Sequence, residues 1–386
     1  MWELLLSVTL ISLGVLFGFY VSYFSLCWLN IHSTHDSKKK KNLTSTYPTV
    51  SIIVPVYNEV RVLDRRIRNL EELNYPKDKL EVVFVDGGST DGSIELLESI
   101  SRKSELRIKN VFQGSRKGFN NAVREGFAST TGDIVYISGA EVEYDPEALS
   151  IMTSHFSDSK VGAVTGRQKI KNLQDGYSPK LEAAYRDLYD FVRAGEGYID
   201  SPFDLKGEIS AARRDIVKAL VENPGLAKKG CIDACFSFQG KMDGYRTVYE
   251  PDAFYYELSP KSMRDSFKQQ TRRAATLIEN MLVFKNMIFN KNFGAFGQLI
   301  MPAHFLMLIV LPYLFIVASI GVILMVVLYP LNLLLVSISI AAFLFLLFSK
   351  RINAFAKAQV ALVVATLRLL RGTETQKFER LDSVRP

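Results

Sequence analysis

Carboxylates are the side chains of this chain best suited to proton transfer. The 386 residues include 40 Asp and Glu but only four histidines, which are scattered along the sequence. This pattern disfavours a Ser-His-Asp hydrolase and a zinc site built from histidines. The three cysteines are too few for a disulfide framework and favour a reducing compartment. We therefore expect acid–base chemistry to rest on Asp and Glu.

Polar and acidic residues follow three short apolar segments. Asn58-Glu59 comes after the first segment, residues 86–91 come after the second, and residues 141–145 come shortly after the third. If the segments are parallel strands, a ligand is expected to bind beyond their carboxyl ends, where these residues lie. Carboxylates at that edge suit hydrogen bonds to the base and ribose of a nucleotide.

The elements that must position these residues alternate between strand and helix. Near-continuous apolar runs predict strands at 51–56, 81–85, 106–113 and 133–137. Helical patterns separate them at 60–73, 93–101 and 119–129. This order predicts an α/β fold with a parallel, Rossmann-type sheet that is covered by helices on both faces.

Two motifs that other proteins place on such a sheet are missing from the sequence. The first predicted strand runs into Pro55–Glu59 and not into the G-x-G-x-x-G of dinucleotide-binding oxidoreductases. Residues 87–92 are rich in glycine, but they lack the Gly-Lys-Ser/Thr ending of a P-loop. The sequence therefore disfavours both of these nucleotide-binding classes.

Three apolar segments are long enough to cross a membrane. Leu4–Leu29 would form about 39 Å of helix. Leu299–Tyr329 and Leu331–Phe348 flank Pro330 and predict a transmembrane hairpin. The competing interpretations are a cleaved signal peptide and a buried helix pair, and the length and lack of charge disfavour them. Phe355–Leu370 is amphipathic and charged, which favours a helix at the membrane surface.

Basic residues beside these segments predict the orientation of the chain. Lys38–Lys41 follows the first segment and Lys350-Arg351 follows the third. The positive-inside rule places both on the cytoplasmic side, together with residues of about 36–295. The net charge of +7 then lies near lipid head groups, so we expect membrane lipids and no nucleic acid as partners.

Two stretches carry a resemblance to a known family. Val54–Glu59, followed by Val85–Ser93, resembles the opening of the family 2 glycosyltransferases, which have the GT-A fold. The resemblance extends to about residue 275. It implies a mixed-sheet GT-A-like domain that transfers a sugar from a nucleotide-diphosphate donor with inversion at the anomeric carbon.

The resemblance also implies a set of donor-binding residues. Pro55, Tyr57, Glu59 and Asp86 match the nucleotide-binding positions of the family, with Asp86 at the base. Lys117 lies where the family often has a basic residue near the diphosphate.

The metal-binding element of the family is altered. Where family members carry Asp-x-Asp, this chain has Gly139-Ala140-Glu141. Glu141 is thus the candidate ligand for a divalent cation, Mg²⁺ or Mn²⁺, with help from Glu143, because such ions take further oxygen ligands from water and phosphate. The alternative is that basic side chains neutralise the leaving group without a metal.

The resemblance places the catalytic base at Asp233, in a segment that precedes Gly-Tyr-Arg at 244–246. The alternative is an ordinary helix-capping role. Cys231 and Cys235 flank this residue, and we interpret them as packing residues. Residues 207–214 resemble the acceptor-side strand of the family.

A Gln-x-x-Arg-Trp element of polysaccharide-building relatives is similar to residues 269–273. Gln269 and Arg272 are predicted to reach the diphosphate, whereas Arg273 stands where Trp is expected. The absence of this Trp and the small number of spans argue against a processive, channel-forming synthase.

These features predict a membrane-bound inverting glycosyltransferase that acts on a lipid-linked or glycan acceptor at the cytoplasmic membrane face. The alternative is a catalytically silent scaffold or regulator of a glycan-assembly complex. The predicted segments are an anchor at 1–30, a basic tether at 31–48, a catalytic domain at 49–275, an interfacial segment at 276–298, transmembrane helices at 299–329 and 331–349, and a tail at 350–386.

Overall fold

The structure is a computed structural model that describes residues 2–33, 47–332, 337 and 349–372. One eight-stranded mixed sheet has the order β3-β2-β1-β4-β7-β6-β8-β5. Its strands are β1 (Val50–Val56), β2 (Leu80–Asp86), β3 (Arg107–Phe112), β4 (Ile134–Ile137), β5 (Glu143–Tyr144), β6 (Val161–Ile170), β7 (Ser210–Arg213) and β8 (Arg246–Glu257). The four strands predicted from the sequence are parallel neighbours, and β7 runs antiparallel to both β4 and β6.

Alternate residues of the central strands enter two separate apolar cores. Ile53 and Val83 pack on one face of the sheet, and Ile52 and Val82 pack on the other, all of them fully buried. Burial on both faces explains why these strands read as continuous apolar runs. The helices next to the sheet are α2 (Val60–Glu71), α3 (Ser93–Ser101), α4 (Phe119–Ala128), α5 (Ala148–Ser154), α7 (Arg214–Glu222) and α8 (Phe236–Met242).

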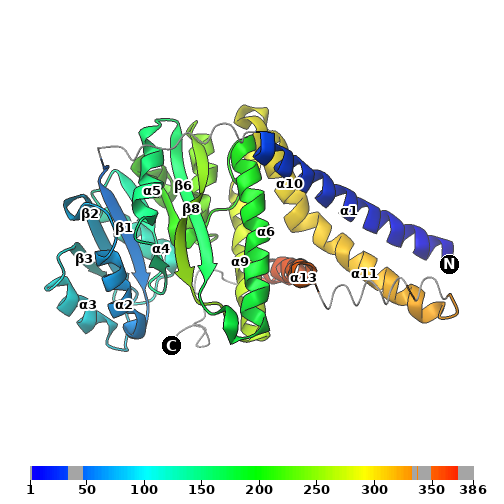
Figure 1. Cartoon of the computed structure of the whole chain (residues 1–386), viewed down its shortest axis with the longest axis horizontal. Coiled ribbons are helices and arrows are strands. Elements are labelled where there is room, and N and C mark those ends of the chain that lie inside the picture. The colour runs from blue at the N-terminus through cyan, green and yellow to red at the C-terminus, as the bar shows by residue number, and fades with distance from the viewer. Residues whose placement is uncertain (1, 34–46, 333–336, 338–348, 373–386) are drawn as a thin grey trace.

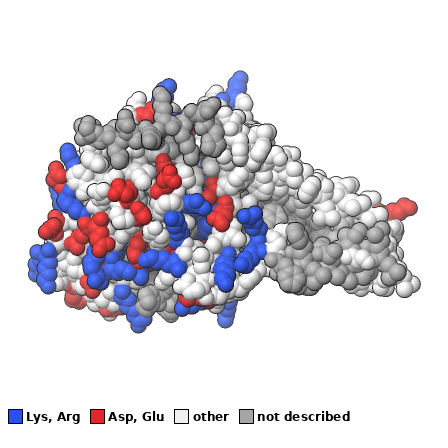
Figure 2. Space-filling model, in the orientation of Figure 1, with Lys and Arg blue, Asp and Glu red and all other residues white. Residues whose placement is uncertain are grey.

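Two long helices connect the sheet to an elongated apolar part. Figure 1 shows α6 (Tyr177–Ile199) and α9 (Met263–Val283) between the sheet and the helices α1 (Trp2–Ser33) and α11 (Leu311–Leu328). Residues 296–328 form one helical stretch that includes α10 (Met301–Phe305) and two π-helical turns. On the face shown in Figure 2, Lys, Arg, Asp and Glu gather over the sheet domain, and the elongated part is nearly without them.

The first helix packs along the later apolar helix. The rings of Trp2 and Tyr329 lie 4.4 Å apart at one end of this pair. At the other end the Tyr23 hydroxyl donates to Glu196 of α6 at 2.6 Å, and His304 Nε2 lies 2.6 Å from the same carboxylate oxygen. The backbone N–H of Phe203 donates to the second oxygen at 2.8 Å. The buried Glu196 carboxylate thus joins α1, α6 and α10.

Three described helices are long and apolar enough to cross a membrane: α1, the stretch 296–328, and α13 (Lys350–Leu370). This set indicates a membrane protein. The predicted spans at 4–29 and 299–329 coincide with the first two, whereas most of the predicted span at 331–349 lies outside the described residues. Helix α13 packs against α6, α9 and α11, and its placement at the membrane surface stays a prediction.

Candidate active site

A cleft of about 200 Å³ opens beyond the carboxyl ends of β1 and β4. This is the edge of the sheet where the sequence gathers its polar residues. Six of the predicted site residues line the cleft: Pro55, Tyr57, Glu59, Glu141, Asp233 and Arg272. The fold therefore brings together residues that are more than 200 positions apart.

Hydrogen bonds fasten the loop after β1 to the loop after β2. The backbone N–H of Asn58 donates to Ser89 Oγ at 2.8 Å, and Asn58 Oδ1 accepts from the N–H of Thr90 at 2.8 Å. The N–H of Glu59 donates to Ser93 Oγ at 2.9 Å. These bonds explain why the two motifs of the sequence act as one wall of the cleft.

Asp86 lies at the end of β2 with no exposed surface. Its Oδ1 accepts from the N–H groups of Gly88 and Ser89, each at 2.8 Å, and its Oδ2 accepts from the Ser89 hydroxyl. Gly88 has a φ of +82°, a conformation that favours glycine. The carboxylate of Asp86 thus orders the turn that carries Gly87 into the cleft wall.

Asp86 itself does not line the cleft, and two further predicted donor-binding residues, Lys117 and Gln269, also lie outside it. Lys117 is exposed and forms an ion pair with Glu125 at 3.0 Å. The neighbouring Arg116 lines the cleft instead, with its guanidinium 4.3 Å above the Tyr57 ring. Gln269 lines neither this cleft nor the cavity next to it.

The altered metal-binding element, residues 139–141, lies at the wall of the cleft. Glu141 follows β4, and its carboxylate lies close to Gly139, where an added Cβ would lie 2.8 Å from Glu141 Oε2. Glu143 forms ion pairs with Arg65 at 3.0 Å and Lys171 at 2.5 Å, which commits its charge elsewhere. Among the described residues no group of three His, Cys, Asp or Glu side chains could hold a metal ion.

Asp233 lies in a short 3₁₀ turn (Asp233–Cys235) before α8. Its carboxylate packs directly on Gly207, where an added Cβ would lie 2.0 Å from Asp233 Oδ2. Burial raises the pKa of Asp233 to about 7, and the negative charge of Glu208 adds to this effect. A carboxylate with a pKa near neutrality suits a general base. The cysteines at 231 and 235 are both buried and free.

Beyond Asp233 a second cavity of about 160 Å³ adjoins the cleft. The two share Gly207, Glu208, Asp233 and Arg272, so Asp233 lies at the boundary between them. The second cavity is lined by α6, α9 and α13, and thus opens toward the helices that could cross a membrane.

Glu208 at this boundary and Arg273 in the second cavity are further residues that were not predicted from the sequence as site residues. Arg273 forms ion pairs with Glu182 at 3.2 Å, Glu257 at 3.5 Å and Glu208 at 3.7 Å. Burial opposes ionisation of Glu208, but the Arg273 guanidinium holds the pKa of that carboxyl below its usual range. The position of Glu208 next to a glycine, in the segment that resembles the acceptor-side strand, is a signal that could have identified it.

Comparison with known proteins connects this geometry to enzymes that transfer sugars. Residues 51–220 match the sequence profile described as "Glycosyl transferase family 2". "Probable glycosyltransferase YdaM" of Bacillus subtilis (strain 168) is 25% identical over 236 residues, covering 59% of this chain and 54% of that protein. "Poly-beta-1,6-N-acetyl-D-glucosamine synthase" of Staphylococcus aureus (strain COL) is 25% identical over 228 residues, covering 58% and 53%. The chain spans about half the length of these curated relatives.

A solved structure extends the similarity over nearly the whole chain. The mannosyltransferase PcManGT from Pyrobaculum calidifontis, in complex with GDP-Man and Mn²⁺, has a TM-score of 0.81 and 23% sequence identity. The match covers 96% of this chain and 100% of that one. The likeness confirms the predicted fold, including its mixed sheet.

Proposed function

We propose that this chain, whose residues 51–220 match the family 2 glycosyltransferase profile, is a membrane-bound inverting glycosyltransferase of that family with a GT-A-like fold. It moves a sugar from a nucleotide-diphosphate sugar to a lipid-linked or glycan acceptor at the cytoplasmic membrane face. The observation that carries this proposal is the cleft at the strand ends. It contains Tyr57, Glu59 and Arg272 on one side of Asp233, and a second cavity leads from Asp233 toward the apolar helices.

In this proposal the donor occupies the cleft. Pro55, Tyr57 and Glu59 contact the base and ribose, next to the turn that Asp86 orders. Arg116 and Arg272 lie in the same cleft, and their guanidinium groups suit the diphosphate because paired N–H donors match phosphate oxygens.

A divalent cation fits this site only together with the donor. Glu141 supplies one carboxylate at the cleft wall, and the diphosphate and water would supply the other oxygen ligands. The mannosyltransferase of similar fold was solved with GDP-Man and Mn²⁺, which supports the use of Mg²⁺ or Mn²⁺ here. Bound there, the ion would stabilise negative charge on the nucleoside diphosphate as it leaves.

Asp233 acts as the base in this proposal. The acceptor hydroxyl oxygen forms a bond to the anomeric carbon of the sugar, and the bond from that carbon to the diphosphate oxygen breaks. The hydroxyl proton passes to the Asp233 carboxylate, and the nucleoside diphosphate departs with the bonding electrons. The cleft and the second cavity adjoin at Asp233. In this proposal the acceptor approaches from the second cavity and attacks the face of the anomeric carbon opposite the leaving group, which gives inversion.

The orientation rests on the basic residues beside the apolar helices. Lys350 and Arg351 begin α13, which packs against α6, α9 and α11, and the positive-inside rule assigns these basic residues to the cytoplasmic side. In this orientation the sheet domain lies in the cytoplasm and binds a cytoplasmic nucleotide-sugar donor.

A turnover assay tests the function. The full chain, purified in detergent, is incubated with UDP-, GDP- and dTDP-sugars, with membrane lipid extract and with or without Mn²⁺. We expect turnover of at least one donor, and no turnover in Asp233→Asn although nucleotide binding remains.

The same assay distinguishes an active enzyme from a catalytically silent scaffold. The loss of the Asp-x-Asp pair favours the scaffold alternative. A scaffold predicts no turnover of any donor, and that result would overturn the proposed activity.

A further inference from the structure

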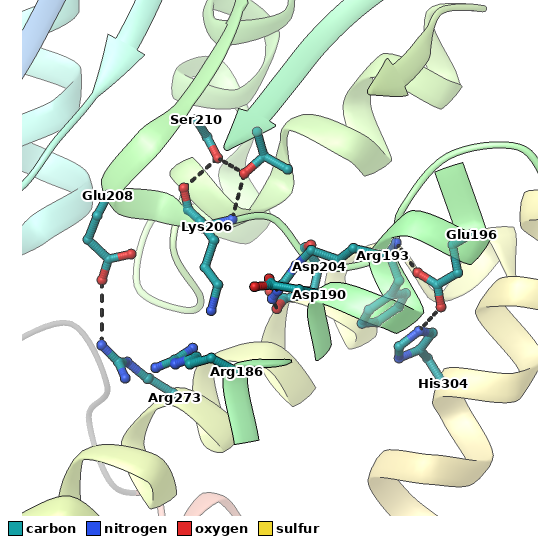
Figure 3. Close-up of polar contacts among 12 residues, drawn as sticks. Arg186, Asp190, Arg193, Glu196, Asp204, Lys206, Glu208, Ser210, Arg273 and His304 are labelled. Atoms are coloured by element: carbon teal, nitrogen blue, oxygen red, sulfur yellow. Dashed lines mark hydrogen bonds and ion pairs between the residues drawn. The ribbon is translucent and has the colours of Figure 1, made fainter. Parts of the chain in front are cut away.

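The second cavity contains a buried cation without a partner. Lys206 is 3% exposed, and among the described residues no acceptor lies within hydrogen-bond distance of its Nζ. Its main chain is fixed, because its N–H donates to Thr165 Oγ1 at 2.9 Å and its carbonyl accepts from Ser210 Oγ at 2.6 Å. Figure 3 shows the side chain extending from this loop toward Arg186 and Arg273.

The acidic residues nearest to Lys206 are already committed to another cation. Arg193 forms ion pairs with Asp190 at 3.0 Å and with Asp204, and its Nε donates to the Asp204 carbonyl at 2.7 Å. Asp190 also lies 3.3 Å from Arg167. Figure 3 shows the pairs of Arg193 with Asp190 and Asp204 beside Lys206. The charges of both carboxylates favour the charged form of Lys206, but among the described residues none forms a hydrogen bond with its ammonium group.

Three guanidinium groups line the same cavity, those of Arg186, Arg272 and Arg273. Arg186 pairs with Glu182 at 2.6 Å, but its Nε has no partner among the described residues, and Arg273 completes the wall. Burial and the positive charges of Arg186 and Arg193 hold the pKa of Lys206 well below its usual range. Since an unpaired buried cation is costly, an anion that entered this cavity would remove an unfavourable arrangement.

The far wall of the cavity is apolar and continues toward the membrane helices. Leu277 of α9 and Leu308 line it, together with Ala358 and Leu362 of α13. A narrow cavity of about 40 Å³ follows and shares part of this wall. It reaches Tyr20 and Phe24 of α1, Phe355 of α13 and Met307.

We infer that the acceptor is a lipid whose head group carries a phosphate, with the phosphate bound by Lys206, Arg186 and Arg273. The beginning of its hydrocarbon chain lies in the passage between α1 and α13. This inference rests on the proposed function, because it names the acceptor class of the same site. Lys206 precedes Gly207, which touches Asp233, so a hydroxyl of the bound head group can reach the proposed base.

Binding of farnesyl phosphate to the full chain in detergent tests the inference without requiring turnover. Farnesol and inorganic phosphate serve as separate probes, and a saturating nucleoside diphosphate occupies the donor cleft throughout. We expect farnesyl phosphate to stabilise the protein against thermal unfolding, and both other probes to bind at least tenfold more weakly.

Lys206→Met retains much of the side-chain volume without the charge, and we expect it to weaken farnesyl phosphate binding about tenfold or more, since charge-assisted hydrogen bonds are lost. Farnesol binding and nucleotide binding should not change. Lys218→Met, on the exposed face of α7, is the matched control, and Lys206→Gln replaces the Met variant if that variant does not fold.

Three results would overturn the inference: equal binding of farnesol and farnesyl phosphate, equal binding of inorganic phosphate, or unchanged affinity in both Lys206 variants. The proposed function can fail separately. Farnesyl phosphate binding that depends on Lys206, without turnover of any donor, would support the lipid site and reject the transferase activity.

Discussion

Asp233→Asn is expected to abolish sugar transfer and to stabilise the folded protein at alkaline pH. Burial raises the pKa of Asp233 to about 7 from its ordinary value of 3.8, and the charge of Glu208 contributes. Asparagine has nearly the same shape but no charge. The variant therefore removes the free-energy cost of holding an ionised carboxylate in a partly buried position.

The magnitude follows from proton linkage. The folded state holds the Asp233 proton more tightly than the unfolded state does, so the stability of the wild type falls as the pH rises from about 4 to 7. A pKa difference of about 3 corresponds to about 4 kcal/mol of folding free energy, which is lost in full once the pH exceeds both pKa values. Between pH 5 and pH 8.5 the stability advantage of the variant should grow by about 2 to 3 kcal/mol.

Thermal unfolding in lipid nanodiscs at both pH values, combined with donor turnover, provides the assay. We expect the melting temperature of Asp233→Asn to exceed that of the wild type by several degrees more at pH 8.5 than at pH 5. Turnover should fall by at least about 10²-fold, the usual contribution of a general base. Asp64→Asn, at an exposed position of α2, is the matched control and should change neither quantity.

Either of two results would refute this reasoning. A stability advantage of Asp233→Asn over the wild type that is the same at both pH values would show that Asp233 does not hold its proton in the folded state near neutral pH. Full turnover in the variant would remove Asp233 as the base, whatever its effect on stability.

Three other substitutions test separate parts of the site. Asp86→Asn keeps the acceptor oxygen for the turn but removes the charge, and calorimetry should show at least fivefold weaker nucleotide binding if the carboxylate contacts the base; equal affinity would limit Asp86 to ordering the turn. Gly207→Ala should lower kcat about tenfold or more at unchanged donor affinity, because its Cβ displaces the Asp233 carboxylate; unchanged kcat would argue against precise placement of that group. Glu141→Gln should abolish any increase in nucleotide affinity that Mn²⁺ produces, and an increase equal to that of the wild type would exclude Glu141 as a ligand.

The sheet could be predicted from the sequence because its strands are short and buried on both faces. Ile52 and Ile53 enter opposite cores, so the segment reads as an uninterrupted apolar run. The antiparallel arrangement of β7 between β4 and β6 was not evident from such runs, because Ser210–Arg213 is short and only partly apolar.

Side-chain direction in loops limited the prediction of the site. Arg116 and Lys117 are adjacent and chemically similar, yet one lines the cleft and the other pairs with Glu125 on the surface. Composition cannot distinguish them, since the difference arises from the backbone of one loop. The same limit applies to Lys206, whose burial becomes apparent only when α6 and α9 pack around it.

The hydrogen bond from Tyr23 to Glu196 joins residues 173 positions apart, and it has a consequence for biosynthesis. The first helix leaves the ribosome long before Glu196 and His304 are translated. During that time Tyr23 lacks its final hydrogen-bond partner. A shortened protein that begins after Ser33 would leave the Glu196 carboxylate without the Tyr23 hydroxyl. The first helix is therefore a structural component of the folded protein, and its removal to obtain a soluble fragment would disturb the loop of Phe203 that leads to Lys206.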